Sequence, residues 1–260
     1  MKLDWHIEPE DVRSVKELCA RMASDALVRE RYENNVTGVR RPEPTPANIW
    51  KALVNCHLTT VARSGPNSAA NRLITHSSFP LALSACKFSP ELEVFIAKTL
   101  KDFGGIRRYY LIARGLTQNL TLLEGGGWSE VENTVASLQR HSTASKERRG
   151  ADEIASRFWG IGPKQARNFL QMLGAARFEI PLDIRVVTWL NQNGFAIHLS
   201  AGALGDTDYY AFVMHGVQIM CKEAGVLPCI FDASVFASVD RGGWSERSLM
   251  WTKGSSDEGA

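Results

Sequence analysis

The sequence predicts an all-α fold, and three observations support this prediction. Apolar side chains recur at three- and four-residue spacing in one segment after another, as on the buried face of a helix. Glycine- and proline-rich stretches separate these segments. No strand-like alternation, internal repeat or heptad pattern interrupts them. The 260 residues suffice for one large domain or for two small ones that share a cleft.

The N-terminal part is expected to be a helix followed by a rigid connector. Residues 11–33 place Val15, Leu18 and other apolar side chains on one helical stripe. Three prolines in the run 41–46 end this helix, because proline lacks the N–H group and stiffens the chain. We therefore assign residues 1–46 to a separate N-terminal segment.

The middle and the end of the chain read as further helices joined by short connections. Ser89 followed by Pro90 is a typical helix start, and paired or tripled glycines end several helices. The polar, basic run at 142–150 predicts a loop, and the Ser/Gly-rich residues 241–260 predict a disordered tail. The expected helices cover residues 47–62, 89–104, 106–123, 128–140, 151–158, 163–173, 183–192, 206–224 and 232–238.

The composition excludes several classes of protein. Hydrophobic residues make up 44% and charged residues 22%, which excludes a mostly disordered chain. No stretch approaches the roughly 18 consecutive apolar residues that a membrane helix needs. The first residues lack the apolar core of a signal peptide. We expect a cytoplasmic protein with no membrane partner.

The cysteines and histidines predict neither disulfides nor a metal centre. The five cysteines are odd in number and scattered, so we expect reduced thiols. The histidines show no spacing typical of metal ligands. The cysteines are Cys19, Cys56, Cys86, Cys221 and Cys229, and the histidines are His6, His57, His76, His141, His198 and His215.

The net charge of +2 hides an uneven distribution. Residues 61–110 carry seven Lys/Arg against three Asp/Glu, and residues 140–185 carry nine against five. Residues 186–260 carry four against eight. One basic surface of this kind suits a phosphate backbone. Ordinary solvated helix faces are the alternative explanation.

The most informative segment begins with a tight turn between two predicted helices. Gly160 and Gly162 flank Ile161, and Pro163 suits the first position of the helix that follows. Such a turn directs backbone N–H groups and the positive end of a helix dipole outward, which favours a phosphate group. A plain hairpin between packed helices is the alternative.

Two linked motifs extend this segment and carry a resemblance to a known family. Lys164 follows the proline at the start of the second helix, and Asp183 follows an extended stretch at a natural N-cap position. The sequence resembles the helix-hairpin-helix DNA glycosylase superfamily (HhH-GPD). The matching residues are Gly160, Gly162, Lys164 and Ala166 in the hairpin, then Pro181, Asp183, Arg185 and Val186.

The resemblance implies two helical lobes with a cleft between them. It implies a glycosylase domain over residues 47–240, with the hairpin at 151–173 and a Pro-Asp loop at 180–186. The match is strong only in the middle of that range. Double-stranded DNA that contains a modified base is the implied partner, and we expect the chain to act as a monomer.

The resemblance also implies the chemistry of two residues. The carboxylate of Asp183 would stabilise positive charge on the sugar while the N-glycosidic bond breaks. Simple helix capping is the alternative role of Asp183, and both roles are compatible. Lys164 would attack C1′ and give a strand-nicking lyase. If Lys164 only contacts a phosphate, the enzyme is monofunctional.

Further residues are expected to contact DNA or the extruded base. Near the cleft, Arg63 and Asn67 could fill the gap that the base leaves, although a helix end with exposed polar residues explains them equally well. Phe231 and Phe236 could wall the base pocket, with a core position as the alternative. The expected DNA contacts are Gly160, Gly162, Gln165, Arg185, Arg63, Asn67 and Arg107, and the expected pocket residues are Asn168, Phe231 and Phe236.

Missing features narrow the branch within the family. Only Cys221 and Cys229 lie late in the chain, so we expect no iron–sulfur cluster, and the only ion considered is a structural monovalent cation at the hairpin. Lys164 without a cluster resembles the 8-oxoguanine DNA glycosylase/AP lyase branch. Asn168 stands where the common eukaryotic-type enzyme has a cysteine.

The substrate therefore stays open at this point. Base excision repair of 8-oxoguanine is the first expectation. A hypermodified, for example glucosylated, pyrimidine in phage DNA is an alternative and would make the protein an antiviral defence enzyme. A helix-hairpin-helix module that binds DNA without catalysis is an alternative of a different class.

Overall fold

The computed structural model describes residues 4–61, 64–193, 198–240 and 243–251. Within these ranges all regular secondary structure is helical, which confirms the all-α prediction. No helix in the described ranges is long and apolar enough to cross a membrane.

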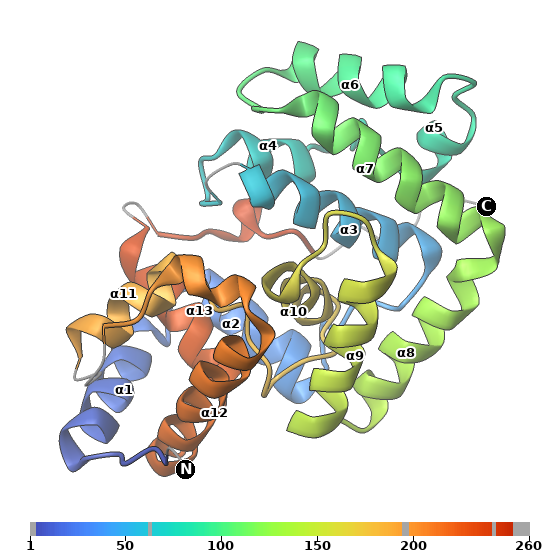
Figure 1. The fold of residues 1–260 in the computed structure, drawn as a ribbon. Coiled ribbons are helices and arrows are strands. Elements are labelled where there is room, and N and C mark those ends of the chain that lie inside the picture. The colour runs from blue at the N-terminus through green and yellow to red at the C-terminus, as the bar shows by residue number, and fades with distance from the viewer. Residues whose placement is uncertain (1–3, 62–63, 194–197, 241–242, 252–260) are drawn as a thin grey trace.

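Helices from the middle of the chain form the first lobe (Figure 1), and their buried side chains make one large hydrophobic core. Trp50 and Phe169 are among its largest fully buried side chains. The helices of this lobe are α3 (Pro46–Val61), α4 (Ala69–Ile74), α5 (Leu83–Lys87), α6 (Leu92–Phe103), α7 (Tyr109–Leu122), η2 (Leu123–Gly127), α8 (Trp128–Arg140), α9 (Ala144–Arg157) and α10 (Pro163–Met172).

The second lobe joins the two ends of the chain around a second core. Helix α1 lies beside α12 and α13, so the blue and the red-orange parts of the ribbon meet in Figure 1. Val15 and Leu18 of α1 contribute to this core with Tyr210 and Phe231. The helices are α1 (Pro9–Met22), α2 (Ala26–Arg31), η1 (Tyr32–Thr37), α11 (Ile184–Gln192), η3 (Ala201–Gly205), α12 (Thr207–Ala224), α13 (Pro228–Val239) and η4 (Glu246–Ser248).

The structure corrects two predictions about local structure. The single helix expected over 11–33 is broken, because Asp25 accepts a hydrogen bond from the N–H of Leu27 at 2.9 Å and caps a new helix. The loop expected at 142–150 is instead the start of α9, with Thr143 as its N-cap. The sequence shows no helical pattern of apolar residues here, because the inward-facing residues of α9, Glu147 and Gly150 among them, are not large and apolar.

The chain beyond α13 is not a separate tail up to Trp251. The indole of Trp251 donates to the carbonyl of Met172 at 2.9 Å, and Leu249 packs on α2. These contacts place residues 243–251 against both lobes. The rest of the predicted tail, residues 252–260, lies outside the described residues.

A buried cluster holds the turn between α9 and α10. Asn119 accepts from the N–H of Trp159 at 2.8 Å and donates to the carbonyl of Trp159 at 3.1 Å. Burial lowers the pKa of His57 to about 4, so its neutral Nε2 accepts from Asn119 at 2.9 Å. Gly115 lies directly beneath, where an added Cβ would meet Trp159 Cε3 at 2.5 Å and His57 Cε1 at 2.7 Å.

We therefore expect Gly115→Ala to destabilise the protein. The clash with two packed rings should cost about 1–3 kcal/mol and outweigh the roughly 1 kcal/mol that alanine gains over glycine in a helix. Thermal unfolding should show a melting temperature several degrees lower. The matched control is Gly125→Ala, since an added Cβ meets nothing within 4 Å there. Equal melting temperatures for the two variants would contradict this account of the turn.

Candidate active site

The turn that follows α9 presents the start of α10 to solvent. Gly160 adopts a φ of +73°, in the left-handed region that favours glycine. Gly162 is the N-cap of α10 and offers no side-chain cap, and Pro163 occupies the first turn. Because no cap covers them, the first N–H groups and the positive end of the α10 dipole face outward.

A buried carboxylate fixes the chain that leads away from α10. Glu147 on α9 accepts hydrogen bonds from the backbone N–H groups of Arg177 (3.0 Å), Phe178 (2.7 Å) and Glu179 (2.8 Å). Burial raises the pKa of Glu147, and these three bonds oppose the rise. Three hydrogen bonds to one side chain of α9 hold the backbone of residues 177–179 in one conformation.

The next residues are held by a tyrosine hydroxyl. Tyr210 accepts from the N–H of Leu182 at 2.8 Å and donates to the carbonyl of Ile180 at 2.8 Å. These two bonds bracket Pro181, which has no N–H of its own. The guanidinium of Arg167 lies 4.5 Å from the centre of the Tyr210 ring and links α10 to this loop.

Asp183 follows this loop as the N-cap of α11. Its Oδ1 accepts from the N–H of Arg185 at 2.8 Å and of Val186 at 3.3 Å, and its Oδ2 pairs with the Arg185 guanidinium at 3.1 Å. Only 11% of its side chain is exposed. These bonds fix the position of the Asp183 carboxyl group at the start of α11.

Lys164 lies in the first turn of α10. It makes no hydrogen bond or ion pair with any residue that the structure describes, so its amine is available to a ligand. Lys164 and Asp183 line the same two hollows. The structure thus brings the two residues predicted to be catalytic to one opening.

The two hollows meet at these residues. An inner pocket of about 120 Å³ lies between the lobes, and an outer groove of about 720 Å³ runs past the starts of α10 and α11. A cavity of roughly 150 Å³ accepts a benzene ring, so the inner pocket is on the scale of one six-membered ring. Both hollows are lined by Thr59, Ser64, Lys164 and Asp183.

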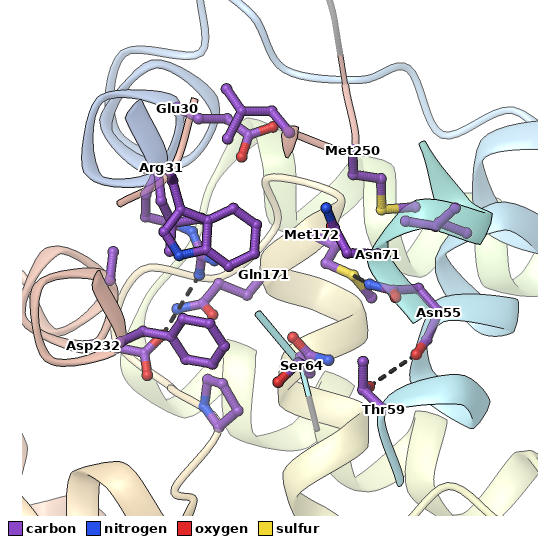
Figure 2. Close-up of a pocket in the computed structure, with 18 of the residues that line it drawn as sticks. Glu30, Arg31, Asn55, Thr59, Ser64, Asn71, Gln171, Met172, Asp232 and Met250 are labelled. Atoms are coloured by element: carbon purple, nitrogen blue, oxygen red, sulfur yellow. Dashed lines mark hydrogen bonds and ion pairs between the residues drawn. The ribbon is translucent and has the colours of Figure 1, made fainter. Parts of the chain in front are cut away.

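The inner pocket is lined by both polar and apolar side chains, some of which Figure 2 labels. Five of its lining residues carry amides, two besides Asp183 carry carboxyl groups and three are aromatic. Burial raises the pKa of Glu30 and of Asp232 to about 7, and the negative charge of Asp183 adds to the rise for Asp232. The residues of these three kinds are Asn34, Asn55, Asn71, Asn168 and Gln171, Glu30 and Asp232, and Phe236, Trp244 and Trp251.

Most of these pocket residues were missed from the sequence. Asn168 and Phe236 were predicted to line the pocket, and they do. Glu30 and Trp251 also line it, but they belong to residues 1–46 and 241–260, which were predicted to lie outside the glycosylase domain. The sequence did contain one indication of the pocket wall. Lys164, Asn168 and Gln171 have the spacing of one helix face, and all three line the pocket.

Phe231 does not line the pocket. Its side chain is fully buried in the core of the second lobe, where its ring centre lies 4.9 Å from that of Trp189. The alternative weighed for this aromatic residue, a core position, describes what the structure shows. Phe236, one turn later on α13, faces the pocket instead.

The residues expected to contact DNA have different surroundings. Gln165 is buried and donates to the hydroxyl of Thr60 at 3.0 Å, which ties α10 to α3. Arg185 donates to the carbonyl of Ser64 at 2.5 Å and stacks 4.0 Å from the centre of the Phe236 ring. Both residues line the outer groove.

Three other predicted contacts lie away from the two hollows or cannot be placed. Arg107 is exposed in the turn between α6 and α7, and Asn67 is exposed in the turn before α4. Neither lines the pocket or the groove. Arg63 lies outside the described residues.

The described residues hold no cluster of three or more His, Cys, Asp or Glu side chains that could bind a metal ion. The five cysteines carry free thiols, and burial raises the pKa of Cys86 and Cys229 to about 12. Thiols in such surroundings stay protonated and unreactive.

Comparison with known proteins identifies the fold. No protein-family model and no curated protein matches the sequence. Among solved structures, the chain is similar to the 8-oxoguanine DNA glycosylase of Thermotoga maritima (TM-score 0.60, 17% identity, 88% of this chain and 95% of the other). It is also similar to the 8-oxoguanine DNA glycosylase of Methanocaldococcus jannaschii (TM-score 0.58, 14% identity, 87% and 92%). The chain has the fold of these two glycosylases.

We expect Tyr210→Phe to loosen the loop before Asp183. Removal of the hydroxyl leaves the N–H of Leu182 and the carbonyl of Ile180 buried without partners, which should cost about 1–3 kcal/mol. Thermal unfolding and amide exchange at Leu182 measure the effect. The control is Tyr209→Phe, whose hydroxyl accepts from the N–H of Ser200 near the surface. Unchanged exchange at Leu182 would show that the hydroxyl does not hold the loop.

Glu30 should make stability depend on pH. Its pKa is about 7 in the folded protein against 4.5 in the unfolded chain, because burial disfavours the charged form. Its stabilising contribution is complete below about pH 4.5 and is lost as the pH rises through 7. Glu30→Gln should therefore raise the melting temperature relative to wild type by at least about 2 °C more at pH 8 than at pH 5.

The matched control is Glu93→Gln, on an exposed position of α6. It should shift the melting temperature equally at the two pH values. If Glu30→Gln behaves in the same way, Glu30 ionises in the folded protein as it does in the unfolded chain.

Proposed function

We propose that this protein is a DNA N-glycosylase that extrudes a damaged base into the inner pocket and cleaves its N-glycosidic bond. One observation carries the proposal: a lysine amine and a largely buried carboxylate share the mouth of a pocket between the two lobes. The fold shared with two 8-oxoguanine DNA glycosylases supports the same activity, and 8-oxoguanine is the first substrate to test.

The outer groove suits the DNA backbone. The N-terminus of α10, which no side chain caps, lies on it and directs a partial positive charge outward. An enzyme that acts on a base within a duplex must take the base out of the stack. A groove that continues into a pocket gives the strand and the extruded base separate places.

The two residues at the mouth can then perform the reaction. Asp183 stabilises the positive charge that develops on the sugar as the bond to the base breaks. The ammonium of Lys164 gives up a proton, the resulting amine attacks C1′, and the base departs with the electron pair of the broken bond and takes up a proton. The sugar ring opens to a Schiff base, and loss of a C2′ proton expels the 3′ phosphate. This path makes the enzyme a glycosylase with AP lyase activity, in base excision repair.

A second candidate substrate is a hypermodified pyrimidine of phage DNA. The five amides and two tryptophans of the inner pocket favour it, since amides pair with hydroxyl groups and indoles pack on sugar rings. The chemistry at the mouth would be the same. Only the base that occupies the pocket would differ.

Variants of the two residues test the proposal. Asp183→Asn keeps a side chain that caps helices well but removes the charge, so base release should fall at least about 100-fold with little loss of stability. Lys164→Met should abolish the covalent adduct that borohydride traps. The control is Lys222→Met, an exposed lysine on α12. The assay uses duplexes with single 8-oxoguanine or glucosylated hydroxymethylcytosine residues.

The outcomes separate the alternatives. Strand scission that needs added alkali, with nothing trapped, identifies a monofunctional enzyme in which Lys164 contacts a phosphate. DNA binding without release of any base identifies a binding module. Full activity of Asp183→Asn would remove the carboxylate from the mechanism.

A further inference from the structure

Gln171 is a buried residue whose amide is left without a partner. Its side chain is 1% exposed, and it lines the inner pocket. Neither Nε2 nor Oε1 has a hydrogen-bond partner among the residues that the structure describes. A buried amide that pairs with nothing destabilises a folded protein, and nearly all buried polar groups do have partners. The partner of Gln171 is therefore expected to be a ligand.

The position of Gln171 fits a ligand that enters past Lys164. Lys164, Asn168 and Gln171 lie on one face of α10, at intervals of four and three residues. At 1.5 Å per residue, Gln171 lies about 10 Å along the helix from Lys164. Figure 2 places it inside the pocket, between Asp232 and Met172. A group held at C1′ near Lys164 would turn its far edge toward Gln171.

The N-terminal helices supply two more unpaired oxygens beside it. Asn34 Oδ1 and Glu30 Oε1 are buried, line the same pocket and have no hydrogen-bond partner in the described part of the chain. Asn35 fixes this arrangement, because its amide donates to the backbone carbonyl of Gln171 at 2.9 Å. The far end of the pocket thus offers one donor and one acceptor on a single amide, with further acceptors next to it.

We propose that Gln171 determines specificity by pairing with the far edge of the extruded base, and that the site takes bases with an adjacent donor and acceptor on that edge. This inference rests on the proposed glycosylase activity. A single amide can give and accept one hydrogen bond side by side, as glutamine does with a base edge in protein–DNA recognition. Asn34 and Glu30 favour a base with a further N–H or O–H group beside that pair.

The test compares two buried glutamines of α10, each replaced by methionine of similar length. Gln171→Met removes only unpaired polar atoms in the free protein, so its melting temperature should stay equal or rise. Gln165→Met breaks the hydrogen bond to Thr60 and should lower the melting temperature. A structural role for Gln171 predicts a fall in both variants.

Activity and binding are measured on the same Gln171→Met protein. Release of 8-oxoguanine, or of whichever base of the assay panel the wild type releases, should fall about 10- to 100-fold in kcat/KM. Binding to a duplex with a tetrahydrofuran abasic site, which presents no base, should stay within about twofold. Binding of free 8-oxoguanine, followed by thermal shift, should weaken by a similar factor to base release.

The possible results separate failure of this inference from failure of the proposed glycosylase activity. Release and free-base binding equal to wild type in Gln171→Met would overturn this inference, as would a melting temperature that falls as in Gln165→Met. A wild type that releases no base but binds the free base through Gln171 would overturn the glycosylase proposal and support this inference. A wild type that neither releases nor binds any base would overturn both.

Discussion

The arrangement of the candidate site depends on the buried carboxylate of Glu147. It accepts hydrogen bonds from three successive backbone N–H groups of the segment 177–179, which would otherwise be buried without partners. Tyr210 continues this support to Leu182, one residue before Asp183. The segment between the amine and the carboxylate is thus held by hydrogen bonds from neighbouring helices, together with the burial of Ile180 and Leu182 in the core of the second lobe.

Asp183 and Lys164, on the two sides of the opening, differ in how firmly they are held. Asp183 is held on both carboxylate oxygens, by the first N–H groups of α11 and by Arg185, so its position is set before any ligand arrives. Lys164 has no partner in the described ranges, so its amine can move to a reacting atom. The opening therefore presents a carboxylate that is held in place and an amine that is free to move.

Much of the fold could be predicted from the sequence, because many helices have large apolar residues at helical spacing and are bounded by Gly or Pro. The start of α9 was not, since its inward face uses Glu147 and Gly150. Within the site, Lys164 and Asp183 follow from local motifs. The pocket wall does not: Glu30 and Trp251 meet there only through the packing of both lobes. Phe231 shows the converse, since an aromatic residue near a site can belong wholly to the core.

The pocket wall built from both flanks of the chain has a consequence for any shortened form. A fragment that spans only residues 47–240 would keep Lys164 and Asp183 yet lose the side chains of Glu30, Asn34, Trp244 and Trp251. Water would then reach the mouth from within, and charges that act strongly in a dry cavity would be screened. Evolution could therefore retune which ligands this scaffold accepts by exchanging its flanks, while the reactive pair at the centre stays as it is.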